Sequence, residues 1–201
     1  MTAEKREQIK NNTYVALTWG FLKWAVIAVI VGVIVGLAGT AFSKALSFAT
    51  AYRTDNKLII LAMPIAGVVI VFLYNAMKLS RDPGTNNIIK GARSEEAVSI
   101  KLAPLIFAAT FLTHITGGSA GREGEALQIG GSLASPFGKL FKLDKEDTSI
   151  LIMCGMAAGF SALFGTPVAA AVFAVEVTIV AAAHDKYGSV LLVKLEKLPE
   201  R

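Results

Sequence analysis

Charged residues are scarce in this chain. They make up 17% of its 201 residues, whereas soluble domains carry about 25%. Together with a mean hydropathy of +0.57, this deficit excludes an ordinary soluble domain and favours a membrane protein. The single cysteine, Cys154, excludes an internal disulfide bond. No metal-ligand cluster, nucleophile triad or phosphate-binding loop stands out, so we expect no enzyme, no metal ion and no cofactor.

Four stretches contain no charged side chain. Since a bilayer core about 30 Å thick needs about 20 apolar residues of helix, the first two predict one membrane span each. The third is long enough to span but ends in glycines. The fourth is interrupted by the segment FGTPV, so we expect two helices there. The four stretches are Trp24–Ser43, Leu58–Met77, Leu102–Gly121 and Thr148–Val175.

The net charge is +5, and the basic residues lie mainly between the expected spans. The positive-inside rule places the N-terminus and two of the loops in the cytoplasm. Membrane topology explains these charges better than a nucleic-acid-binding patch does, so we expect no nucleic-acid partner. The basic residues in question are Lys5, Arg6, Lys10, Lys78, Arg81, Lys90, Arg93, Lys101, Lys139, Lys142 and Lys145.

The chain divides into three predicted parts. Residues 1–13 form a polar cytoplasmic tail, residues 14–185 a transmembrane unit, and residues 186–201 the start of a helix that becomes charged too soon to span. Small residues at three positions of the first span predict a face that another helix approaches closely; they are Gly32, Gly36 and Gly39. We expect helices over 14–50, 58–78, 86–93 (short and re-entrant), from Glu95 to about 116, and over 125–141, 147–163 and 167–180.

Two glycine-containing segments predict helices that begin inside the membrane. Such a helix leaves its first backbone N–H groups without intrahelical partners, and these carry roughly half a positive charge. Glycines let the helix start approach an ion closely. GGSAGREG, residues 117–124, therefore predicts an anion-facing helix start, and PGTNN, residues 83–87, a second one. Two broken helices whose N-termini share a midplane point are a recurring plan for anion transport.

Glu123 lies at the first of these helix starts. Its carboxylate can occupy the positive tip as a tethered anion and, once protonated, leave and admit a free anion, so that one residue gates the pathway and carries a proton. The alternative is a structural salt bridge of Arg122 with Glu123 or Glu125. His114 is a candidate proton relay, although a hydrogen bond to a neighbouring backbone or hydroxyl group, such as that of Thr113 or Thr116, explains it better.

Three segments resemble, in order and spacing, the CLC family of chloride channels and proton-coupled anion antiporters. GREG, QIGG and AAGFSALFGTPVAAAVFAVE carry this resemblance, which covers roughly residues 25 to 185. It implies an all-α integral membrane protein, a CLC-type first inverted repeat with broken, re-entrant helices. It also implies that Glu123 is the gating glutamate, that Arg122 belongs to the outer approach, and that the protein is a homodimer in a bacterial inner (plasma) membrane. The candidate anion-binding residues are Gly84, Thr85, Asn86, Asn87, Arg122 and Gly124.

The chain departs from typical chloride-type members at several positions. They read G-S-G-I-P where this chain reads GTNNI at 84–88, and proline where this chain has Glu125. Many exchangers carry two consecutive glutamates where Glu176 is followed by Val177. THITGGSAGREG, residues 113–124, resembles the fluoride-exporting branch better, which favours fluoride/proton antiport. His114, Glu125 and Glu176 are the weaker candidates for the proton path.

A fluoride site has a physical rationale in the same residues. Fluoride is small and strongly hydrated, so its site should be rich in donors, and the hydroxyl of Thr85 and the amides of Asn86 and Asn87 can supply them. The asparagines can equally be caps of the short helix.

The family is built from two inverted repeats, and this chain resembles the first one alone. We therefore expect a second repeat as a partner and no complete pore without it. A chloride channel or chloride/proton exchanger half, and a non-transporting membrane remnant, remain alternatives.

Overall fold

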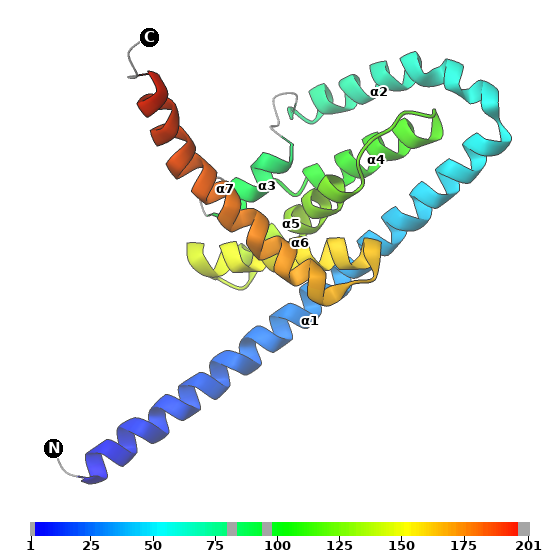
Figure 1. Cartoon of the computed structure of the whole chain (residues 1–201). Helices are drawn as coiled ribbons and strands as arrows, with labels where there is room; N and C mark the ends of the chain where they lie inside the picture. The colour runs from blue at the N-terminus through cyan, green and yellow to red at the C-terminus, as the bar shows by residue number, and fades with distance from the viewer. Residues whose placement is uncertain (1–2, 80–83, 94–97, 197–201) are drawn as a thin grey trace.

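The structure is a computed structural model that describes the backbone of residues 3–79, 84–93 and 98–196 and the side chains of residues 17–79, 84–93 and 98–181. Over these residues the chain is helical and contains no strand, as the sequence predicts. Figure 1 shows one long helix that crosses the whole molecule and shorter helices that gather along its second half. The elements are α1 (Ala3–Asp55), η1 (Lys57–Ala62), α2 (Met63–Ala76), α3 (Thr85–Ala92), α4 (Leu102–Ile115), α5 (Glu123–Leu140), α6 (Lys145–Phe164) and α7 (Pro167–Glu196).

Three helical segments are long and apolar enough to cross a membrane. They are Leu17–Asp55, Lys57–Ala76 and Lys145–Phe164, and Leu102–Ile115 and Pro167–Ala181 are shorter apolar helices. Large apolar side chains point outward along the spans, as Leu37 does on α1 and Val68 on α2. In a soluble protein such exposure would be costly, whereas in a bilayer these side chains contact lipid. The two stretches predicted to hold single spans thus each hold one.

Several helix boundaries differ from the predicted ones. The helix α1 runs without a break from Ala3, so residues 3–13 belong to the same helix as the first span, which begins at Leu17. The second span begins as the 3-10 helix η1 and becomes α-helical only at Met63, because Pro64 fits the first turn of an α-helix but not its interior. Glu95 lies outside the described residues, and α4 begins at Leu102, with Pro104 in its first turn.

The closest helix contact joins α5 to α6 through glycines. A Cβ atom on Gly130 would lie 2.1 Å from the backbone oxygen of Gly155, and one on Gly159 would lie 2.4 Å from the backbone oxygen of Ala126. Small residues allow such an approach in membranes, where packing and not hydrophobicity holds helices together. We call Gly130, Gly155 and Gly159 the glycine contact.

The small-residue face predicted on α1 is only partly occupied. Gly39 meets α6, where its Cβ atom would lie 2.7 Å from Cβ of Ala162. Gly32 and Gly36 have no atom within 4 Å of the equivalent position. Close approach along α1 is therefore confirmed at one of the three glycines within this chain.

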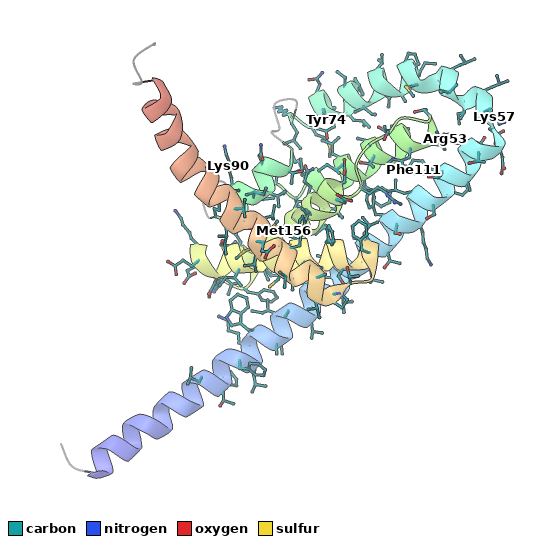
Figure 2. All side chains as sticks on the ribbon, viewed as in Figure 1. Arg53, Lys57, Tyr74, Lys90, Phe111 and Met156 are labelled. Carbon is teal, nitrogen blue, oxygen red and sulfur yellow. The ribbon has the colours of Figure 1, made fainter. Side chains whose placement is uncertain are left out.

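The eight-residue helix α3 is held by tertiary contacts, since a helix this short is unstable alone. Ile88 is fully buried and packs on α5, where a Cβ atom on Gly131 would lie 2.6 Å from Cγ2 of Ile88. At the other end of α3, the hydroxyl of Ser149 on α6 donates a hydrogen bond to the backbone oxygen of Ala92. Met156 of α6, which lies at the centre of the molecule (Figure 2), belongs to the same buried core.

Candidate functional site

The helices α3 and α5 both begin where the sequence predicts broken helices. Gly84 precedes α3 with φ 68° and ψ −136°, a conformation that glycine adopts without strain. Arg122 precedes α5. Neither N-cap residue forms a side-chain cap hydrogen bond, and the backbone amide of Asn87 in the first turn of α3 donates to the backbone oxygen of Gly84.

The two helix starts lie against each other. A Cβ atom on Gly124 would lie 2.8 Å from Oγ1 of Thr85, so a larger residue at this position would require the Thr85 side chain or the start of α5 to shift. One turn further along α5, Nε2 of Gln128 donates a hydrogen bond of 3.2 Å to the same Oγ1. The structure thus brings together two of the predicted anion-binding residues, Thr85 and Gly124, from segments far apart in the sequence.

The remaining predicted donors on α3 differ in how far they are exposed. Gly84 and Asn87 are half-buried, whereas Asn86 is exposed. Because all of them lie within the first turn of α3 or directly before it, their backbone N–H groups belong to its electropositive end. Two electropositive helix starts and the hydroxyl of Thr85 thus lie together, and this is the chemistry that attracts a small anion.

The acidic residues of α5 differ in exposure. Glu123, the first residue of the helix, and Arg122 are exposed. Glu125 is half-buried, and its Oε2 lies 3.5 Å from the position of a Cβ atom on Gly121, so its carboxylate folds back over the helix start. It lies there close to its own backbone amide and near the side chains of His114 and Glu123. Over residues 98–181, the structure forms no ion pair between Arg122 and either glutamate.

His114 lies in the last turn of α4 with its Nδ1 2.9 Å from the backbone oxygen of Thr110. Since a carbonyl oxygen only accepts, Nδ1 carries a hydrogen and donates it in this bond. The predicted hydrogen bond to a neighbouring group is confirmed, although its partner is Thr110 and not Thr113 or Thr116. Glu176 lies on α7 with an exposed side chain, and its place in a proton path stays a prediction.

The segment that joins α4 to α5 is fixed at its first turn. The amide of Gly118 donates to the oxygen of Thr113 and that of Gly117, which has φ 93°, to the oxygen of His114. This pair of bonds is a Schellman motif. Arg53 at the end of α1 packs on Gly117, with its Cδ 3.2 Å from the position of a Cβ atom there, and Figure 2 shows Arg53 beside the end of α4.

Gln128 lies at the contact of α3 with α5, although its sequence position predicts no functional role. Its side chain is 8% exposed, in a stretch of α5 that is otherwise apolar and buried. A signal for it exists in the sequence, because a long amide that follows Gly124 by four residues lies on the same helix face. The partner on α3, 43 residues away, could not be found from that spacing.

Comparisons with known proteins agree with this geometry. A family model described as voltage gated chloride channel matches residues 67–195. A chloride/fluoride channel protein of Pseudomonas syringae pv. tomato is 34% identical over 172 residues, which are 85% of this chain and 37% of the relative. The H(+)/Cl(-) exchange transporter ClcA of Cronobacter sakazakii is 30% identical over 166 residues, which are 75% of this chain and 35% of the relative.

Two solved structures are similar to the fold. The crystal structure of a CLC-type fluoride/proton antiporter superposes with a TM-score of 0.74 at 38% identity, over 79% of this chain and 40% of that one. The structure of a slow cyanobacterial Cl−/H+ antiporter superposes with a TM-score of 0.58 at 27% identity, over 72% of this chain and 37% of that one. The chain thus spans well under half the length of the proteins that it matches.

Proposed function

Because the chain belongs to the voltage gated chloride channel family, we propose that it forms the N-terminal half of an anion transporter, with the anion held between the starts of α3 and α5. The chain is an integral membrane protein of several apolar helices. The observation that carries the proposal is the contact of Thr85 with Gly124 and Gln128. It brings two helix N-termini, each with a partial positive charge, to one point where a free anion is stabilised.

Fluoride is the anion that we favour. A small anion of high charge density gains most from closely placed donors, and Thr85, Asn86 and Asn87 provide them beside the backbone amides. The relative described as a chloride/fluoride channel protein is 34% identical, and the solved fluoride/proton antiporter is 38% identical. A chloride/proton exchanger half is the second candidate, because ClcA is 30% identical.

In this proposal, a carboxylate at the start of α5 carries the proton. Glu123, the first residue of the helix, competes with the anion for the positive tip when charged and withdraws when protonated, so that anion and proton exchange in opposite directions. Glu125, which folds over the same turn, is the competing candidate, with His114 next to it along the path. Efflux of fluoride is then driven by protons that move inward.

The working protein contains more than this half. We propose that a second CLC repeat completes the pore, that the assembly is a homodimer, and that it lies in a bacterial inner membrane with its N-terminus in the cytoplasm. The basic residues between the spans support this orientation.

Vesicle flux measurements test the proposal. The chain is reconstituted alone and together with the C-terminal half of the Pseudomonas syringae relative, and fluoride, chloride and proton movements are recorded. We expect fluoride efflux with proton uptake in the paired sample. Glu123→Gln should stop proton uptake, whereas Glu125→Gln, two residues away in the same turn, should leave it within about threefold.

Each other outcome has a distinct meaning. Proton uptake that is lost in Glu125→Gln but kept in Glu123→Gln transfers the gating role to Glu125. Equal chloride flux without proton movement contradicts antiport and favours a channel half. No flux and no anion binding in either sample contradicts transport and leaves a non-transporting membrane protein.

A further inference from the structure

We infer that Gln128 is a positioning residue of the anion site, which sets the direction of the Thr85 hydroxyl so that its hydrogen points to the anion. The inference rests on the proposed function, since it needs an anion between α3 and α5. It assigns Gln128 a role in affinity and in the choice between fluoride and chloride.

The first support is the burial of the Gln128 amide. The residue is 8% exposed and lies between the core residues Leu127 and Ile129. A buried amide without a hydrogen-bond partner costs free energy, so the side chain is held to the partner that it has. That partner is Oγ1 of Thr85, 3.2 Å from Nε2, at the position where α3 begins.

The second support is the chemistry of the hydroxyl group. A threonine hydroxyl has one hydrogen to donate and two lone pairs to accept with. Because the amide nitrogen of Gln128 can only donate, Oγ1 of Thr85 accepts in this bond, and its own hydrogen remains for another acceptor. A charged acceptor makes the stronger bond, and an anion at the two helix starts is such an acceptor.

The third support is the position of Thr85 in its helix. Seven other threonines among the described residues donate their hydroxyl hydrogen to the carbonyl oxygen four residues earlier, which uses up that hydrogen. Thr85 is the first residue of α3, so it cannot form this bond within its own helix. The threonines with this backbone bond are Thr40, Thr50, Thr54, Thr113, Thr116, Thr148 and Thr178.

The direction of the hydrogen bond between Gln128 and Thr85 determines whether removal of the amide lowers or raises the affinity for the anion. If the amide donates, its removal lets the hydroxyl rotate away from the anion, and affinity falls. If the amide were turned so that its oxygen faced Thr85, the hydroxyl would donate to Gln128, and removal of the amide would free that hydrogen and raise affinity. A single substitution therefore separates the two arrangements.

The test measures anion binding by the full chain in detergent, with fluoride and chloride as the probes and calorimetry as the readout. The variants are Gln128→Met, which keeps the length of the side chain without its amide, Thr85→Val, which removes the hydroxyl, and the double variant. Ser132→Ala is the control, because Ser132 is buried on the same helix and donates to the backbone oxygen of Gln128. Thermal unfolding is recorded for all variants, and Gln128→Ala replaces the methionine variant if that one does not fold.

We expect Gln128→Met to weaken fluoride binding by about threefold to tenfold, the effect of one hydrogen bond, and chloride binding by less. In the Thr85→Val background the same change should have almost no effect on affinity, because the hydroxyl that it positions is gone. Ser132→Ala should alter stability and not affinity. Unchanged or tighter fluoride binding in Gln128→Met, or equal losses with and without the Thr85 hydroxyl, overturns the role of Gln128. Absence of fluoride binding by the unaltered chain, both alone and together with the C-terminal half of the Pseudomonas syringae relative, contradicts the proposed function instead.

Discussion

Gly130→Ala tests the glycine contact between α5 and α6 at its closest point. The added Cβ atom would lie 2.1 Å from the backbone oxygen of Gly155, whereas ordinary contact begins at 3.4 Å. Both atoms belong to rigid helices, so α5 and α6 must separate by about 1 Å. A gap of this size forfeits roughly a quarter to a half of the dispersion energy of each contact along the interface. We expect the free energy of unfolding to fall by about 2–3 kcal/mol, in the range of overpacked cores.

The matched control is Gly36→Ala on α1, where no atom lies within 4 Å of the new Cβ atom. Replacing glycine by alanine inside a helix otherwise stabilises it by about 0.5–1 kcal/mol, so this variant should unfold at the same denaturant concentration or higher. Unfolding in mixed micelles, followed by circular dichroism, measures both variants. Equal stability of Gly130→Ala and Gly36→Ala would contradict the packing argument.

Two further substitutions test single local features by the same unfolding assay. Asp144→Ala should cost about 1 kcal/mol, because the side chain of Asp144 caps α6 with a 2.7 Å bond from the amide of Asp147; Asp144→Asn keeps the cap, and an equal loss there would argue against it. Lys142→Gly should raise stability by up to about 1 kcal/mol, since Lys142 follows α5 with φ 52°, where glycine has no strain; a loss of stability would mean that the lysine side chain contributes more than its backbone conformation costs.

Local signals in the sequence account for several of the helix boundaries. The predicted helix 147–163 is observed as α6 because an aspartate cap precedes it and Gly165, with φ 70°, ends it. The predicted helix 86–93 is observed as α3, shifted by one residue, because Gly84 permits the turn before it. Glycine, proline and caps act through their nearest neighbours, which is why one sequence suffices to find them.

Contacts between distant segments could not be predicted in the same way. The sequence predicts a helix-packing face from the glycines on α1, but the shortest of these glycine contacts in the described residues joins Gly130 to Gly155 and Gly159 on α6. Both sets have helical spacing, and nothing in the spacing says which face meets a partner. The role of Gln128 could not be predicted for the same reason, because it depends on a hydrogen-bond partner that lies on another helix, 43 residues away in the sequence. The functional roles assigned to Glu123, Arg122 and the asparagines stay predictions.

The proposed anion site depends on packing well away from it, because α3 alone is too short to be stable. Its N-terminus meets α5 through Thr85, its middle rests on Gly131 through Ile88, and its C-terminus is bonded to Ser149 of α6. The helices α5 and α6 are in turn in close contact at the glycine contact. Because the N-terminus of α3 contacts α5 and its C-terminus is bonded to α6, a change that separates these two helices also increases the distance between the groups that hold the two ends of α3. The hydrogen bond from Gln128 to Thr85, already 3.2 Å long, is the contact with the least room to lengthen before it is lost. Substitutions at the glycine contact should therefore weaken anion binding through the same hydroxyl that Gln128 positions, although they touch neither helix start.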